Sequence, residues 1–291
     1  MPTKTILDAV AQVPGVVGLA SKNLTTGQEI RHNAEQIFFT ASTLKVPLLV
    51  ELYRQVDQGL IDVNQRIELD IPDRVPGGGV LKELSSGLRP TIHDLAMLMI
   101  IISDNMATDI LFHLVGRDKL NNTLADLGLD QTHLPMTCRE LIYSVCGMEV
   151  SQPLHSLELA TDKLKQQEFD LNATALSENF SDISSPDNMC QLLEAIYDGE
   201  ILSATSRNAV LDILKRQQLD NVIPSALPPG TIVAHKTGTL PSIRCDVGIV
   251  FSPVGPYTLA LMAKQLNSAD RLGTDASLAA VSRAIYDEFT S

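Results

Sequence analysis

The segment Ser42-Thr43-Leu44-Lys45 places a hydroxyl and an amine three residues apart at the start of a helical pattern. Side chains at this spacing lie one turn apart on the same face of a helix. The unpaired N–H groups of a first helical turn favour a developing oxyanion, and the apolar residues after Lys45 would desolvate its amine and lower its pKa. The pair therefore predicts a nucleophile and its base. A capping serine and a lysine with a solvated tip would give the same letters.

Two further polar clusters follow along the chain. Ser103-Asp104-Asn105 comes at the end of a strongly apolar helical run, where polar residues can also cap one helix and begin the next. Lys236-Thr237-Gly238-Thr239 directly follows a strand-like run. It offers a cation, a hydroxyl and a backbone that a ligand can approach closely, although lysine is also common on the edge strand of a sheet.

The combination is more specific than any one of its members. The clusters occur in this order, and each lies in a local context that suits its chemistry. Such a set should arise by chance in roughly one in a thousand chains of this composition. A nucleophile, a base beside it, an anion clamp and an acid for the leaving group are what acyl transfer from a strained amide or an ester needs.

The elements that must position these residues change in type along the chain. Apolar residues recur with helical spacing over residues 4–13, and the runs 15–21 and 28–33 read as a β-hairpin. Residues 41–214 are predominantly helical, and the segment 137–156 within them shows no clear period. The helical runs cover residues 46–60, 91–102, 106–115, 118–127, 185–197 and 203–217. Short strands at 231–235, 246–252 and 257–263 precede a closing amphipathic helix over 276–289.

This order predicts an α+β fold. Strands from both chain ends would form one antiparallel sheet with helices on both faces, and the helical block would be a central all-helical subdomain. We expect a single catalytic domain over residues 1–291. Its sheet part would comprise residues 1–40 together with 222–291, and its helical part residues 41–221.

Composition narrows the classes of function. Of the 291 residues, 44% are hydrophobic and 20% are charged, which predicts a globular protein with a sizeable core. The net charge of −13 argues against a nucleic-acid binder and against adhesion to anionic membranes. No apolar run reaches the roughly 18 residues of a membrane span. We therefore expect a small-molecule substrate as the partner, and the sequence gives no sign of an oligomeric state.

Cysteine spacing and the N-terminus add two expectations. Cys138, Cys146, Cys190 and Cys245 lack the spacing of a zinc site, so we expect reduced thiols and neither a metal nor an organic cofactor. Residues 1–13 do not resemble a signal peptide. The localisation therefore stays open between the cytosol and export after a leader has been removed.

The three clusters match, letter for letter, the S-x-x-K, S-D-N and K-T-G signatures of the serine β-lactamase and penicillin-binding-protein superfamily. The chain most resembles its class A β-lactamase-like branch. The loop 76–81, the run 91–99 and the segment 234–250 also look similar, so the resemblance covers nearly the whole chain. It implies a β-lactamase-like fold.

The resemblance also implies a role for each matching residue. Ser42 would be the acylated nucleophile and Lys45 its activator. Ser103 would pass a proton to the leaving nitrogen, and Asn105 would hold the side-chain amide of the substrate. The substrate carboxylate would bind at two residues of the third cluster, Lys236 and Thr237. The backbone N–H groups of Ser42 and Thr239 would form the oxyanion hole. Gly238, between Thr237 and Thr239, would belong to the same substrate-binding segment.

One element of the class A pattern is less regular here. Family members carry a glutamate, in E-x-x-L-N, that activates the water for deacylation. Glu168 begins such a segment, 68 residues before Lys236 but 65 residues after Ser103, a longer interval than the family usually has. Glu168 is therefore a candidate base, and the alternative is a solvated glutamate on a polar loop. Glu140 is a weaker substitute.

Arg244 and His235 lie near the third cluster. Arg244 would add a second cation to the carboxylate pocket if the strand continues past Pro241, and otherwise it is a surface arginine or a partner of Asp246. His235 should face away from Lys236 because side chains alternate along a strand, so we expect a structural role for it.

The sequence therefore predicts a serine hydrolase that forms an acyl-enzyme and hydrolyses β-lactams. The alternatives are a peptidase, an esterase or another amide hydrolase of the same superfamily, and a penicillin-binding domain with slow turnover.

Overall fold

The computed structural model describes residues 2–149, 155–267 and 270–291. Its strands are β1 (Val16–Asn23), β2 (Glu29–His32), β3 (Phe38–Phe39), β4 (Ile183–Ser184), β5 (Ile232–Leu240), β6 (Ile243–Ser252) and β7 (Gly255–Lys264). Its α-helices are α1 (Lys4–Val10), α2 (Lys45–Asp57), α3 (Ile92–Ile101), α4 (Asn105–Val115), α5 (Arg117–Asp126), α6 (Cys138–Val145), α7 (His155–Gln166), α8 (Pro186–Asp198), α9 (Ala204–Lys215) and α10 (Arg271–Thr290). A short 3₁₀ helix, η1 (Ala41–Leu44), leads into α2.

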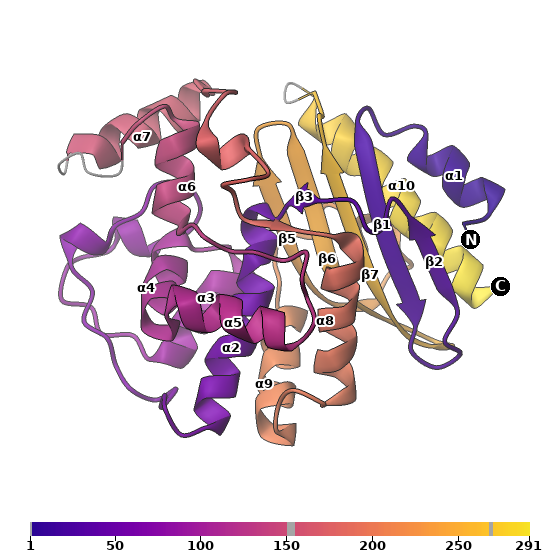
Figure 1. The fold of residues 1–291 in the computed structure, drawn as a ribbon, viewed down its shortest axis with the longest axis horizontal. Coiled ribbons are helices and arrows are strands. Elements are labelled where there is room, and N and C mark those ends of the chain that lie inside the picture. The colour runs from indigo at the N-terminus through magenta and orange to yellow at the C-terminus, as the bar shows by residue number, and fades with distance from the viewer. Residues whose placement is uncertain (1, 150–154, 268–269) are drawn as a thin grey trace.

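The two ends of the chain meet in one sheet. Five antiparallel strands lie in the order β2-β1-β7-β6-β5, and the N-terminal strand β1 pairs with β7 along its whole length. Strand β5 therefore lies at one edge of the sheet, beside the helical part (Figure 1). The predicted α+β class and the antiparallel sheet are confirmed.

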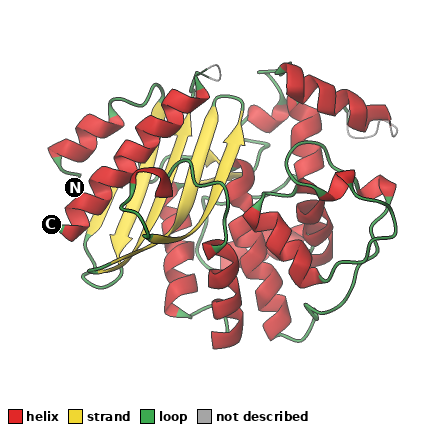
Figure 2. Cartoon of the chain, turned by 180° about the vertical axis from the view of Figure 1, so that it is seen from behind, coloured by secondary structure: helices red, strands yellow, loops and turns green. Residues whose placement is uncertain are grey.

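Helices cover both faces of this sheet. The terminal helices α1 and α10 pack together on one face, which is seen in front in Figure 2. Leu259, Leu261, Leu278 and Val281 belong to the apolar core on that side. On the opposite face α8 contacts β1 and β7, and α9 contacts β5. The remaining helices extend this second layer away from the sheet, as the sequence predicts (Figure 1).

Two helices were not predicted: α6 lies in the segment 137–156, which shows no clear period, and α7 begins at its end. Helix α6 has only eight residues, which is too short for a 3.6-residue repeat to stand out. Its start is fixed by a capping box, in which Thr137 accepts from the Glu140 N–H and Glu140 accepts from the Thr137 N–H. Helix α7 begins at the edge of the described residues. Helix α8 is capped by Ser185, whose Oγ accepts from the Asn188 N–H at 3.2 Å.

The four cysteine side chains are buried as free thiols. In the described part of the chain, no helix has the length and apolar character needed to cross a membrane. The division into a sheet part and a helical part stays a prediction.

Candidate active site

A tight backbone turn sets the position of Ser42. Ala41 adopts a φ of 45°, and the Thr40 N–H donates to the Asp182 carbonyl at 2.9 Å, which ties the turn to a distant segment. The Thr40 hydroxyl donates to the same carbonyl rather than capping the helix. Ser42 then lies in η1 and Lys45 is the first residue of α2, so the two are one turn apart as predicted.

The Lys45 side chain is completely buried and its amine is surrounded by the second polar cluster. Its Nζ lies 2.9 Å from the Ser103 carbonyl, 3.0 Å from Ser103 Oγ and 2.9 Å from Asn105 Oδ1. Burial lowers the pKa of this amine below its usual range. Among the described residues, the Ser42 hydroxyl makes no hydrogen bond, and it lines the same cavity as Ser103. The arrangement therefore places a hydroxyl, without a hydrogen-bond partner in the described part of the chain, one helical turn from a buried amine whose pKa is lowered.

The second cluster also fixes the loop 76–81. Asn105 donates from Nδ2 to the Pro76 carbonyl at 3.0 Å, and its backbone N–H donates to the Gly78 carbonyl at 3.1 Å. Asp104 caps α4 by accepting from the Ala107 N–H, and its other oxygen accepts from the backbone of residues 80 and 81. The helix-cap interpretation of Asp104 thus holds. Ser103 and Asn105, on either side of it, are left to contact Lys45.

The third cluster lies within β5 rather than after it. Lys236 is completely buried, and its Nζ donates to the Thr237 carbonyl at 2.8 Å. Burial and the nearby Lys45 lower the pKa of this amine well below its usual value. Gly238 faces η1 so closely that a Cβ would lie 2.7 Å from the Thr40 carbonyl oxygen and 3.1 Å from the Ser42 nitrogen. Glycine at this position therefore allows the strand edge to reach the nucleophile.

Arg244 reaches the site by a different route from the one anticipated. The strand does not continue past Pro241, because β5 ends at Leu240 and β6 begins at Ile243. The register of this hairpin places Arg244 opposite Thr239, and its Nη1 donates to the Thr239 hydroxyl. The guanidinium also forms a bidentate ion pair with Asp275, in which Nη2 lies 2.9 Å from Oδ2.

His235 has a structural environment. It is buried, with Nδ1 2.8 Å from Asp246 Oδ1 and Nε2 3.3 Å from Asp220 Oδ1. Burial alone would lower its pKa, but the two carboxylates outweigh burial and raise the pKa of His235 to about 9. Asp246 also accepts from the Ile223 N–H, so this ion pair anchors β5 and β6 beneath the site.

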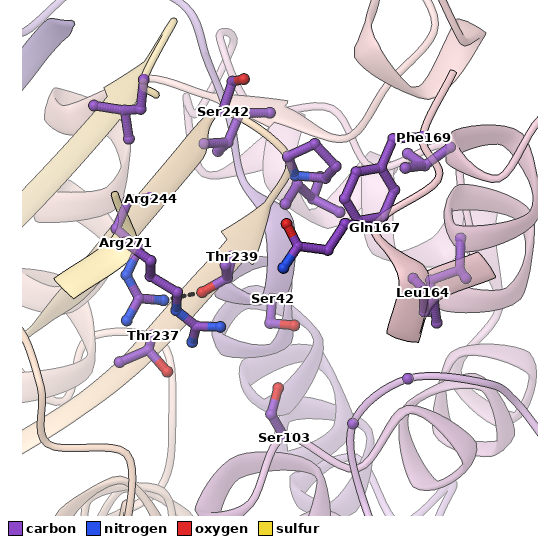
Figure 3. Close-up of a pocket in the computed structure, with 18 of the residues that line it drawn as sticks. Ser42, Ser103, Leu164, Gln167, Phe169, Thr237, Thr239, Ser242, Arg244 and Arg271 are labelled. Carbon is purple, nitrogen blue, oxygen red and sulfur yellow. Dashed lines mark hydrogen bonds between the residues drawn. The ribbon is translucent and has the colours of Figure 1, made fainter. Parts of the chain in front are cut away.

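A cavity of about 640 Å³ opens beside Ser42, and Ser103, Asn105 and Thr237 also line it (Figure 3). We call the set Ser42, Lys45, Ser103, Asn105 and Lys236 the polar floor. Both lysines lie beneath the cavity surface.

The side chains of Ile142, Val145, Leu164, Gln167 and Phe169 line the cavity from α6, α7 and the residues after α7, and we call this set the α6–α7 wall. Arg244 and Arg271 line the opposite side, beside Thr237 and Thr239 (Figure 3).

Glu168 does not lie among the cavity-lining residues. Its side chain is exposed, whereas its neighbours Gln167 and Phe169 both line the cavity. The Gln167 carboxamide points into the cavity in Figure 3. In the described part of the chain, no aspartate or glutamate lines this cavity. Glu140 is held by Arg117 and by the cap of α6.

Sequence reasoning missed Gln167, Phe169 and Arg271 as lining residues. The expected element E-x-x-L-N directed attention to Glu168. A left-handed residue decides which side chains of this segment turn inward, since Gln167 has a φ of 56°. Arg271 begins a helix far along the chain, and no pattern near it signals a site.

The comparisons agree with the fold and with the family resemblance. The model of the beta-lactamase enzyme family matches residues 1–289. The beta-lactamase VEB-1 of Pseudomonas aeruginosa is 24% identical over 250 residues, which cover 82% of this chain and 74% of that protein.

Two solved structures are also similar. A beta-lactamase from Sphaerobacter thermophilus has a TM-score of 0.78 and 29% identity, and the match covers 97% of this chain and 93% of that one. A mutant of PBP-A, solved as an acyl-enzyme complex with penicillin G, has a TM-score of 0.80 and 27% identity, with 99% and 95% coverage. With a family match over nearly its whole length, this chain belongs to the beta-lactamase enzyme family.

Proposed function

We propose that this protein opens β-lactam rings by attack of Ser42 on the lactam carbonyl, which forms an acyl-enzyme. The observation that carries the proposal is the buried amine of Lys45, one turn from a free serine hydroxyl and bonded to Ser103 and Asn105. Its family membership and the likeness to a penicillin acyl-enzyme complex support the same substrate class.

The proposed acylation proceeds by three proton transfers. The neutral Lys45 amine takes the proton of Ser42 Oγ as the oxygen attacks the carbonyl carbon. The oxyanion is stabilised by the backbone N–H groups of Ser42 and Thr239. When the C–N bond breaks, Ser103 Oγ gives its proton to the leaving nitrogen, and the Lys45 ammonium, 3.0 Å away, restores it. The lysine ends the step neutral, so it can act again.

The substrate carboxylate binds at the edge of β5 in this proposal. Thr237 lines the cavity, and the Lys236 amine lies directly beneath it. A carboxylate in this position raises the pKa of Lys236 again, because an opposite charge favours the ammonium form. Binding of an anionic substrate therefore takes up a proton at Lys236.

A second candidate function is supported by the wall of the cavity. Deacylation needs a base for the attacking water, and a carboxamide such as that of Gln167 cannot serve as one. Because no carboxylate of the described residues lines the cavity, the acyl-enzyme would be long-lived. The protein would then bind penicillin covalently with slow turnover rather than hydrolyse it rapidly.

Intact-protein mass spectrometry after exposure to benzylpenicillin tests the acylation. We expect a mass gain equal to the whole penicillin, because ring opening expels no atoms. Ser42→Ala should show no adduct. Ser86→Ala, which removes an exposed loop hydroxyl far along the chain, should react like the wild type. An adduct on Ser42→Ala, or none on the wild type together with no hydrolysis, contradicts the proposal.

The persistence of the adduct then separates the two candidates. Steady hydrolysis of a chromogenic cephalosporin indicates a β-lactamase. A single stoichiometric burst indicates a long-lived acyl-enzyme.

A further inference from the structure

Three basic side chains lie at the β5 and α10 side of the cavity. They differ in whether they are charged and in whether they are paired with other groups. Lys236 is buried, and burial with the nearby Lys45 lowers the pKa of its amine well below the usual value. Arg244 is bound through Nε and Nη2 to Asp275 and through Nη1 to Thr239. The third cation, Arg271, is exposed at the cavity surface.

Arg271 is the cation that no hydrogen bond or ion pair from the described residues holds, although Asp275 lies near enough to act on its charge. Among the described residues, its guanidinium makes neither a hydrogen bond nor an ion pair. The two carboxylates nearest to it in sequence are engaged elsewhere: Asp270 caps α10 at the Gly273 N–H, and Asp275 holds Arg244 and Asn221. A guanidinium stays charged at any physiological pH. Arg271 therefore gives this cavity a permanent positive charge in a protein whose net charge is −13.

The cavity is lined by more than the residues at the site of attack. Besides Ser42, Thr237 and Thr239, its lining includes Leu266, Arg271 and Thr274 from the C-terminal end of the chain. In a bicyclic lactam, the carbon that carries the carboxylate is bonded to the lactam nitrogen. When that carboxylate lies at Thr237, a substituent on the adjoining ring carbon extends past it, toward the α10 end.

We propose that Arg271 forms a second anion subsite, which selects substrates whose leaving-group ring carries an additional carboxylate or sulfonate. This inference rests on the proposed function, since the first carboxylate and the lactam carbonyl set the position of the second acidic group. Arg244 acts as a positioning residue here. Its ion pair with Asp275 removes the carboxylate that would otherwise neutralise Arg271, one helical turn away.

A matched pair of cephalosporins isolates the second charge. Cefamandole and cefonicid carry the same mandelamido group and the same tetrazolylthiomethyl group, and they differ by a methyl against a sulfomethyl substituent on the tetrazole. Binding to Ser42→Ala, which cannot form the proposed acyl-enzyme, is measured by titration calorimetry at low salt. We expect cefonicid to bind more tightly than cefamandole by about fivefold, which is what one partly solvated ion pair contributes.

Variants of α10 assign this preference to one side chain. Adding Arg271→Ala to Ser42→Ala should abolish the preference for cefonicid, and Arg271→Lys should restore most of it. Arg283→Ala is the matched control, because Arg283 lies on the same helix but pairs with Asp287 at the surface. Raising the salt concentration should weaken the preference in the parent and leave the Arg271→Ala protein unaffected. No preference in the Ser42→Ala parent, or an equal preference with and without Arg271, overturns the subsite.

Failure of the subsite and failure of the proposed function give different results. The wild-type protein is mixed with each cephalosporin and the adduct on Ser42 is followed by mass. Acylation of both compounds with equal affinities refutes the Arg271 subsite and keeps the acyl-enzyme. A sulfonate preference at equilibrium without any adduct keeps the anion subsite and refutes the acyl-enzyme.

Discussion

The polar floor and the α6–α7 wall lie at the same cavity, yet they are built in different ways. In the floor, Lys45 and Lys236 are completely buried, and their amines are bonded to neighbouring backbone and side-chain oxygens. The wall instead rests on a small separate cluster around Leu141 and Ala175, and its residue Gln167 is exposed. In the proposed mechanism, the floor carries the groups that form the acyl bond. The wall carries apolar side chains and an amide where a base for water would be needed.

If the proposed mechanism holds, this difference predicts that acylation and deacylation depend on separate parts of the molecule. The buried floor favours a neutral amine because burial disfavours the charged form of Lys45. The exposed wall has no such constraint, so substitutions there can change turnover without disturbing the nucleophile.

Removal of the buried Lys45 amine should have the largest effect of the changes considered, and it should act on the rate of acylation. Lys45→Met keeps an unbranched apolar side chain in the buried space but leaves Ser42 without a base. We expect acylation by a chromogenic cephalosporin to slow by about 10³-fold. Stopped-flow measurement of the burst gives the rate, and circular dichroism checks the fold. Acylation at the wild-type rate would show that another group activates Ser42.

A carboxylate placed in the α6–α7 wall should accelerate deacylation. Gln167→Glu points a base into the cavity, and we expect the loss of the penicillin adduct to accelerate by about 10²-fold. The formation of the adduct should change much less, because the floor is intact. The decay of the adduct mass after a penicillin pulse measures the effect.

Glu168→Gln is the matched control for that variant, since Glu168 is exposed and outside the cavity lining. Its adduct should decay as in the wild type. If Glu168→Gln slows the decay strongly instead, Glu168 is the deacylation base that the sequence element suggests, and the wall closes further on the substrate than this structure shows.

The ion pair beneath the floor should make stability depend on pH. The pKa of His235 is raised to about 9 in the folded protein, against about 6.5 when unfolded. Its stabilising contribution is therefore complete below pH 6.5 and is lost as the pH rises through 9, at up to about 1.4 kcal/mol per pH unit. The lowered pKa values of Lys45 and Lys236 give the opposite slope. Urea unfolding of the wild type and His235→Gln across this range isolates the histidine as the difference between the two curves. Parallel curves would remove His235 from this role.

Local patterns were sufficient to predict most of the elements. Helices α2 to α5, α8 and α9, and the paired strands β1 and β2, lie where the residue periods place them. Helix α6 was not predicted because its two turns are too short to show a repeating pattern of apolar residues.

The course of the chain around Pro241 depended on the hairpin between β5 and β6. A turn there, with Ser242 at a φ of 58°, returned the chain and set Arg244 opposite Thr239. The sequence shows the proline but not the pairing partner.

By itself, the sequence determined the order and local spacing of the polar clusters, because a helix turn and a strand are properties of neighbouring residues. Ser42 and Lys45 share a helical turn wherever that helix packs. Only the tertiary structure decided that Gln167 rather than Glu168 lines the cavity, and that Asp275 neutralises Arg244 while Arg271 stays unpaired. These outcomes depend on one left-handed residue and on contacts between segments about 30 residues apart, which no local period records.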